Sequence, residues 1–394
     1  MHAARLSGTN LERVGNHNYR VTLQAIRVHE TVTRTELVAF TGLTSPAIFN
    51  ITKRLLRERL IISSGRVEGG RGHPPTLLSI NPEGCFSIGI NIDRDHLTVV
   101  ALDLMGQIRA RAVLESDFAL PQAVAYFFRT SVEGMLAAGK FDRKRLIGVG
   151  VAIPDRLSHI DLPNRPASYA AWDTVDVADL FSGVIHGPVF IENDATAAAL
   201  GELQFGHGLR QPSFFYILIS AGLGGGLVID GVQFRGAHGR SGEIGFLPLH
   251  SLRPRADDLG QAVSLTGLYD MLRTGGYDVP RPNALEQLDA GGQALVEEWL
   301  DTSADLLTDP LIAVSCLVDP QAVFIGGRLP ESLVDRLADR LNIKLAERGR
   351  GIPVIAPVQR AAMASDAPAV GAALLPFIDR LLPTRAALMK TAEI

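Results

Sequence analysis

The stretch IENDATAAALGE, residues 191–202, places an Asn and an Asp side by side where an apolar run gives way to an alanine-rich segment. The run GPVFIE before the pair predicts a buried strand, and a helix is expected to begin near Ala195 and run past Glu202. A carboxylate next to a carboxamide offers acceptors and a donor to paired hydroxyl groups, and the carboxylate can also remove a proton. Asn193 and Asp194 therefore either hold a polar ligand or cap the helix.

Charge divides the chain of 394 residues into a basic head and an acidic body. The first 82 residues hold eleven Lys and Arg against five Asp and Glu, a net charge of +6, which leaves −10 for the remainder because the whole chain carries −4. Such a split indicates that the head alone contacts a polyanion.

Composition also limits where the protein works. No apolar run approaches the roughly 20 residues that cross a bilayer, and the N-terminus has no apolar core of the signal-peptide kind. Cys85 and Cys316 are too few for a disulfide framework or a zinc cluster, so we expect a cytoplasmic protein that does not contact a membrane.

Residues 18–80 predict three helices followed by a β-hairpin. Thr33 and Glu36 form the S/T-x-x-E pattern of a capping box at the start of the second helix. Gly42 can end that helix in a left-handed conformation, which a residue with a side chain resists. The length of the helices and the glycine between them indicate a helix-turn-helix.

The third helix and the hairpin carry the candidate DNA contacts. Pro46 suits the first turn of this helix, with Ser45 as a cap before it, and the helix would enter the major groove. The hairpin would form a wing that lays arginines on phosphates or in the minor groove. The alternative is a small helical domain with a solvated charged face. The candidate DNA contacts are Ser45, Pro46, Asn50, Lys53 and Arg54 in the helix, and Arg66 and Arg71 in the wing.

The body predicts a duplicated α/β fold with a cleft between two lobes. Apolar runs of strand length, such as FSIGINI, LIGVGVAI, FFYILIS and AVFIGG, alternate with helical segments in both halves. Its glycine-rich stretches match neither a dinucleotide fingerprint nor a P-loop, so they are interpreted as structural turns. We expect a head at 1–82 and a body at 83–394, with lobes of approximately 83–200 and 201–394.

Taken in order, these motifs resemble the ROK family of repressors, open reading frames and sugar kinases, over nearly the whole chain. GRGHPPTLLSINP resembles the DNA-binding half of its repressors, VGVAIPD its glycine-proline turn, and LPN with Trp172 a sugar-site segment. ENDATAAALGE resembles its Glu-Asn-Asp signature and AHGRSGEIGF its Gly-Glu-Ile-Gly-His segment. The resemblance, to xylose- and N-acetylglucosamine-type repressors among others, implies a winged helix-turn-helix followed by a two-lobed actin/hexokinase-like (ribonuclease H-like) α/β domain.

The resemblance also implies roles for individual residues. In the family's kinases, the Asp that matches Asp194 is the general base that removes a proton from a sugar hydroxyl. Asn164, Asn193 and Glu243 match positions that hydrogen-bond sugar hydroxyls. A site of this kind rejects analogues that lack a hydroxyl, since its buried polar groups are then left unpaired.

The phosphate loop departs from the family's pattern. The kinases carry Asp-x-Gly-Gly-Thr after the first strand of the body, whereas this chain has INIDRDHLTVV. Phosphoryl transfer depends on positioning phosphates and screening their charge, so the added carboxylates of Asp93 and Asp95 are expected to repel ATP. Ser220-Ala221-Gly222 also replaces the usual Gly-Thr-Gly. Asp194 is then a vestigial base, and no catalytic residue and no cofactor are expected.

The zinc site of the family is also altered. Phe246 stands where relatives have a His ligand, and the segment after it contains His250 but no cysteine. Zinc needs about four N or S ligands, so we expect no metal.

These expectations favour a transcriptional regulator, a repressor of carbohydrate genes, that binds an operator in double-stranded DNA. A sugar or sugar phosphate in the cleft would change lobe closure and the spacing of two heads in a homodimer or a dimer of dimers. One alternative is an active ATP-dependent sugar kinase fused to a DNA-binding head. Another is a regulator that responds to a partner protein, with a vestigial cleft.

Overall fold

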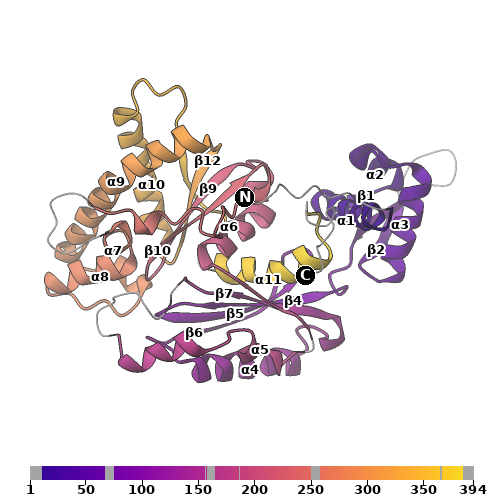
Figure 1. Ribbon diagram of the computed structural model, residues 1–394, viewed down its shortest axis with the longest axis horizontal. Coiled ribbons are helices and arrows are strands. Elements are labelled where there is room, and N and C mark those ends of the chain that lie inside the picture. The colour runs from indigo at the N-terminus through magenta and orange to yellow at the C-terminus, as the bar shows by residue number, and fades with distance from the viewer. Residues whose placement is uncertain are drawn as a thin grey trace, which may run out of the picture.

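The chain folds into a small head and a two-lobed body. In Figure 1 the head, with α1, α2 and α3, lies at one end of the molecule, beside the end of α11. None of the helices described is long and apolar enough to span a bilayer. The computed structural model describes residues 11–66, 75–155, 157, 165–185, 187–249, 258–363 and 366–384.

The head consists of three helices and a three-stranded antiparallel sheet in the order β1-β3-β2. The predicted succession of three helices and a hairpin is confirmed. Its elements are α1 (Leu11–His29), β1 (Thr31–Val32), α2 (Arg34–Thr41), α3 (Ser45–Arg57), β2 (Ile61–Arg66) and β3 (Thr76–Ile80).

The ends of α2 and α3 follow from local chemistry. The capping box of Thr33 and Glu36 is present, and Gly42 ends α2 in the left-handed region with a φ of 67°. The prediction of Ser45 as a cap is wrong. The helix begins one residue earlier than predicted, so Thr44 holds the N-cap position, without a side-chain hydrogen bond, and Ser45 is already helical. Proline in the first turn satisfies the geometry there, because its missing N–H has no partner in a helix start.

Each lobe of the body contains a five-stranded mixed sheet with the same strand order. In each sheet, two strands joined by antiparallel pairing lie on one side of the central strand, and two strands joined by parallel pairing lie on the other. This repetition confirms the predicted duplication. The first sheet is β6 (Ile108–Glu115), β5 (His96–Asp103), β4 (Phe86–Ile92), β7 (Leu146–Ala152) and β8 (Val189–Glu192). The second is β11 (Val232–Gln233), β10 (Leu223–Ile229), β9 (Phe214–Ile219), β12 (Ala322–Gly327) and β13 (Val358–Arg360).

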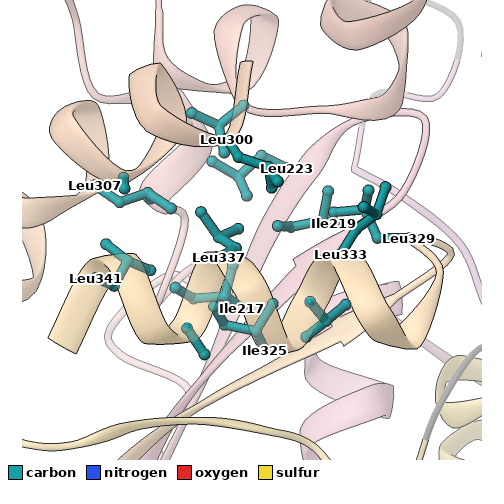
Figure 2. Packing of buried hydrophobic residues seen from close by; sticks show 14 of the residues in the cluster. Ile217, Ile219, Leu223, Leu300, Leu307, Ile325, Leu329, Leu333, Leu337 and Leu341 are labelled. Atoms are coloured by element: carbon teal, nitrogen blue, oxygen red, sulfur yellow. The ribbon is translucent and has the colours of Figure 1, made fainter. Parts of the chain in front are cut away.

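Helices cover the outer face of each sheet and pack through apolar stripes. On α10, Leu333, Leu337 and Leu341 recur at helical spacing and face α9 and the second sheet, as Figure 2 shows. Helices α4 (Pro121–Ala137) and α5 (Asp179–Ser182) lie on the first sheet. Helices α7 (Leu259–Ala262), α8 (Leu265–Thr274), α9 (Ala290–Val318) and α10 (Glu331–Arg348) lie on the second.

Two helices, α6 (Asp194–Phe205) and α11 (Ala367–Arg380), lie between the two sheets (Figure 1). Helix α6 packs on β10 of the second sheet, and α11, although it comes last in the chain, packs on β4 and β7 of the first. The predicted lobe boundary near residue 200 falls inside α6. The division into domains at residues 82 and 200 stays a prediction.

Small residues allow the two central helices to approach closely. A Cβ at Gly371 of α11 would overlap the carbonyl oxygen of Ala197 in α6, and a Cβ at Gly150 of β7 would overlap that of Ala372. The backbones therefore meet without intervening side chains. Overpacking at such a contact forces the backbone to shift.

We expect Gly371→Ala to destabilise the protein by about 1–3 kcal/mol, because the added methyl group has no space between α6 and α11. The matched control is Gly134→Ala in α4, where no atom lies within 4 Å of the added Cβ. This control should be neutral or stabilise the helix by up to about 1 kcal/mol. Urea unfolding followed by circular dichroism measures both. Equal midpoints for the two variants would contradict the close packing.

Candidate functional site

Several acidic and amide side chains meet at one edge of the first sheet. Strands β4, β7 and β8 run parallel to one another, so their carboxyl ends lie at the same edge, where ligands of α/β folds bind. Asp93 follows β4, Asp155 follows β7, and Asn193 and Asp194 follow β8. The topology therefore gathers these residues, which are far apart in the sequence, at the mouth of the cleft.

Asn193 and Asp194 have different roles at the start of α6. Asn193 is the N-cap, and its Oδ1 accepts a hydrogen bond from the N–H of Thr196 at 3.1 Å. Asp194 is the first residue of the helix and is buried, with Oδ1 accepting from the N–H of Ala195 at 2.8 Å. Asn193 thus occupies the N-cap position, and Asp194, one residue further on, accepts one more N–H of the first turn. Oδ2 of Asp194 accepts no backbone N–H from the described part of the chain.

The environment of Asp194 favours its protonated form. Burial raises the pKa of this carboxyl to about 7, with a further increase from the Asp93 carboxylate that the Arg94 guanidinium opposes. A carboxyl with a pKa near neutrality exchanges a proton readily at physiological pH, which suits a group that accepts a hydrogen bond from a hydroxyl.

Glu192 connects the two lobes beside the Asn-Asp pair. Its Oε1 accepts from the N–H of Asn193 at 3.1 Å, while Oε2 accepts from Gln233 at 3.3 Å and pairs with Arg235. The carboxylate of Glu192 is buried, whereas the Arg235 side chain is mostly exposed to water. Sequence reasoning did not select Glu192, although it is the first residue of the Glu-Asn-Asp signature.

Glu243 lies close to two further charged groups. Its pKa is raised by burial and by the Asp155 carboxylate, against the effect of Arg240, which lies 3.4 Å from Asp155. Glu243 and Asp194 also influence each other electrostatically, so two predicted sugar contacts lie in one site. Asp155 was not predicted, although its position after a buried strand was a usable signal.

Two parts of the predicted sugar segment differ in what they contribute. Asn164 lies outside the described residues, so its role stays a prediction. Trp172, in the 3-10 segment η2 (Ala167–Thr174), is buried, and its Nε1 donates to the carbonyl of Ala119 at 3.0 Å. Nε1 of Trp172 therefore stabilises the first lobe by a hydrogen bond to its backbone.

The turn that replaces the phosphate loop is filled by its own side chains. Asp93 Oδ1 accepts from the Arg94 N–H at 2.8 Å and pairs with the Arg94 guanidinium at 3.3 Å. Arg94 is itself buried and reaches the second lobe, where a Cβ at Gly222 would lie 3.2 Å from its Nη1. Arg94 thus spans the cleft between the β4–β5 turn and the Ser220-Ala221-Gly222 turn.

Asp95 also has partners from both lobes. One oxygen is 2.7 Å from Nδ1 of His96, and the other is 2.9 Å from Arg328, which follows β12. Arg328 also reaches Glu115 at 2.6 Å. Burial acts to raise the pKa of Asp95, but the His96 bond and the Arg328 charge outweigh it, so the pKa lies below its usual value.

These contacts change the expected effect of the two carboxylates on ATP. Each of the two carboxylates has an arginine partner, and the expected repulsion of ATP stays a prediction. Paired charges repel an anion less than free ones. Beside these two carboxylates, the side chain of Arg94 is buried in the turn.

The same turn contains a group with the spacing of metal ligands. Ligand atoms of Asp93, Asp95 and His96 lie within 4.8 Å of one another. Asp93 and Asp95 already pair with Arg94 and Arg328. The positive charges of these arginines oppose the binding of a divalent cation. His250 lies outside the described residues, and the expectation of no metal stays a prediction.

In the head, the predicted DNA contacts on α3 are exposed. Ser45, Pro46, Asn50 and Lys53 all face solvent. Arg54 is exposed too, but it pairs with Glu58 at 2.8 Å and its guanidinium lies 4.4 Å from the ring centroid of Tyr19. Arg66 ends β2, and Arg71 lies outside the described residues. The role of these residues in DNA binding stays a prediction.

The head rests on the two central helices of the body. Arg27 of α1 is buried and donates to Oε1 of Gln204 at the end of α6, while its guanidinium lies 5.2 Å from the ring centroid of Phe205. Arg20 donates to the carbonyls of Ile378 and Leu382, at the end of α11 and just beyond it, at 3.2 Å each. Nothing in the sequence pattern indicated these contacts, because they join segments more than 170 residues apart.

The raised pKa of Asp194 makes a pH-dependent prediction. The native carboxyl holds its proton up to about pH 7, whereas the unfolded one loses it near its ordinary pKa of 3.8. The native state therefore binds more protons across this window, and stability falls as pH rises from about 4 to 7. We expect Asp194→Asn to relieve this loss, with a stability gain about 3 kcal/mol larger at about pH 8 than at about pH 5.

Thermal unfolding of the ligand-free protein at the two pH values measures the effect. Asp117→Asn removes a carboxylate from an exposed turn and is the charge-matched control. A gain for Asp194→Asn that is equal at both pH values would show that Asp194 is charged throughout.

Comparison with known proteins places this geometry in a family. Residues 87–377 match the model of the ROK family. The protein y4fQ of Sinorhizobium fredii is 31% identical over 91% of this chain and 90% of its own length. The xylose repressor of Bacillus spizizenii is 26% identical over 60% of this chain, and the match spans 62% of that repressor.

Solved structures share the fold. The crystal structure of a ROK family transcriptional regulator, a homologue of the E. coli MLC protein, matches with a TM-score of 0.70 and 20% identity over 94% of this chain and 98% of the other. That match includes the head as well as the body. The family model alone spans most of the chain, and the chain belongs to the ROK family.

Proposed function

We propose that this protein is a DNA-binding transcriptional regulator, a repressor of carbohydrate genes, controlled by a sugar or sugar phosphate in its cleft. The observation that carries the proposal is helix α6. Its first turn presents Asn193 and Asp194 to the cleft, and its last turn presents Gln204 and Phe205 to Arg27 of the head. One rigid element thus touches both the effector site and the DNA-binding head.

The head supports binding to DNA. The exposed face of α3 carries Asn50 and Lys53, a donor-acceptor side chain and a cation, as expected of a helix that enters the major groove. The net charge of +6 on the first 82 residues attracts the phosphate backbone. The xylose repressors among the relatives agree with this reading.

The cleft supports binding of a hydroxyl-rich ligand. Asp194 and Glu243 offer carboxyl groups, Asn193 offers an amide, and Asn164 is proposed to join them. Buried polar groups of this kind need hydrogen-bond partners, and a sugar supplies them in pairs. Because α6 begins at this site, a ligand that alters the lobes also alters the surface on which the head rests.

We propose that the protein is no kinase. Arg94 fills the turn where the family's kinases have their phosphate loop, and it lies against Gly222 of the opposite lobe. Phosphoryl transfer needs a phosphate held at this position. Asp194 would then accept a hydrogen bond from a sugar hydroxyl without any phosphoryl transfer. This role favours a regulator over an active kinase.

The proposal includes a dimer that works in the cytoplasm. Helix-turn-helix proteins read two half-sites about one helical turn apart, so two heads are required, from a homodimer or a dimer of dimers. Effector binding would change the distance or angle between these heads.

The proposed linkage predicts reciprocal effects of DNA and effector. We expect one class of sugar or sugar phosphate to raise the thermal midpoint, since a ligand that binds only the folded state stabilises it. The same ligand should change DNA affinity by about 5- to 150-fold, and DNA should change effector affinity by the same factor. Fluorescence anisotropy with a selected duplex and isothermal calorimetry with a sugar panel measure the two affinities.

Other outcomes would support the alternatives. Steady phosphate transfer from ATP to a sugar would establish that the protein is a sugar kinase. If no sugar raises the thermal midpoint, a regulator that responds to a partner protein is favoured. Failure to bind any duplex would exclude a DNA-binding regulator.

The contact between Arg27 and Gln204 predicts a substitution that uncouples effector binding from DNA binding. Arg27→Met keeps the aliphatic packing on Phe205 but removes the hydrogen bonds to α6. We expect each ligand still to bind by itself, while the coupling factor falls to less than about threefold, well below the usual range. The same anisotropy titration, with and without effector, measures this loss.

Arg20→Met is the matched control, because it removes hydrogen bonds from the head to carbonyls of the α11 region instead of to α6. This variant should keep the wild-type coupling factor. Equal loss of coupling in both variants would mean that the whole interface, not α6, transmits the signal.

A further inference from the structure

The exposed face of α3 carries an aromatic residue that the fold does not use. Phe49 is 52% exposed and lies beside Pro46, Asn50 and Lys53 at helical spacing. The buried side of the same helix is formed by Ile48, Thr52 and Leu55, so the core of the head is complete without Phe49. A large apolar ring in water on a basic face gains free energy only if a partner covers it.

The ring of Phe49 is held in place from the neighbouring helix. The guanidinium of Arg34, at the start of α2, lies 5.5 Å from the ring centroid. Nε of Arg34 donates to Oγ1 of Thr52 at 2.9 Å, and that hydroxyl donates to the Ile48 carbonyl at 2.8 Å. The buried hydroxyl thus fixes the cation, and the cation fixes the ring.

The major groove offers one apolar feature to a helix inside it, the 5-methyl group of thymine. Asn50 and Lys53 match its polar features, the hydrogen-bonding base edges and the phosphates. Phe49 precedes Asn50 on the exposed face of α3 and has the Arg34 guanidinium beside its ring, so an apolar ring is exposed among polar and charged side chains. We infer that Phe49 is a specificity-determining residue that packs on the methyl group of a thymine in each half-site.

This inference rests on the proposed function, since it needs α3 to lie in the major groove. The inference predicts an A·T pair in each half-site, at the position that Phe49 contacts. Arg34 is a positioning residue in this reading, because it acts through the orientation of the ring.

Removal of single methyl groups from the DNA tests the inference. Duplexes that bind the full-length protein are selected from a random library, and each thymine of a half-site is then replaced by deoxyuridine, which keeps the hydrogen-bonding edge. We expect the wild-type protein to lose about fourfold in affinity at one thymine per half-site, the factor that corresponds to burial of one carbon group. Phe49→Ala should bind the thymine and uracil duplexes equally, and Phe49→Leu should keep part of the preference.

Phe40→Ala is the matched control. Phe40 is 50% exposed, stacks on His29 and belongs to α2, not to α3. This variant should keep the wild-type preference for the methyl group, and the thermal midpoint of each variant reports whether the head is folded. The inference is overturned if Phe49→Ala keeps the wild-type penalty for uracil, or if the wild type is indifferent to every methyl group. If no duplex is selected at all, the proposed function fails, and the inference fails with it.

Discussion

The contact between α6 and α11 is the constraint on which the rest of the body depends. The two helices fill the space between the sheets, and their backbones meet at Gly371 and Ala197 with no side chain between them. Larger residues at this contact would separate the two helices and, with them, the sheets on which they pack. Glu202 secures the same region, since its buried carboxylate accepts from the backbone of His207, Ala362 and Met363.

Because the contact is made of backbone and methyl groups, it has little capacity to absorb strain. Close-packed interiors transmit small displacements instead of damping them. In the proposed mechanism, a shift at Asp194, at one end of α6, would be carried along the helix to Gln204 and Phe205 at the other end, where Arg27 of the head is bound. Hydrogen bonds and a cation–π contact of the buried Arg27 fix the orientation of the head on α6. A purely apolar surface would not fix this orientation.

Local chemistry could be predicted from the sequence, whereas contacts across the cleft could not. The capping box at Thr33 and the left-handed Gly42 depend on neighbours in the chain and were predicted correctly. The duplication of the α/β unit was also predicted correctly, from the alternation of apolar runs and helical segments in both halves. The pairing of Glu192 with Arg235 and of Asp95 with Arg328 depends on how two lobes meet, for which a single sequence has no periodic signal. The N-cap of α3 was placed one residue late, because Thr and Ser both suit that position and only the backbone decides between them.

The distribution of these ion pairs also indicates which side of the cleft can respond to a ligand. At the turn after β4, Arg328 pairs with Asp95 of the other lobe, and Arg94, buried against Asp93, lies close to Gly222 of the second lobe. Loss of one partner of a buried ion pair costs several kcal/mol. At the opposite side, Arg235 is mostly exposed where it meets Glu192, so this bridge is easier to rearrange. The other carboxylate oxygen of Glu192 accepts a hydrogen bond from the N–H of Asn193, directly before α6. The proposed hydroxyl-rich ligand, if it competes for Glu192, Asn193 and Asp194, would act at the more exposed of the two bridges, next to the helix that reaches the head.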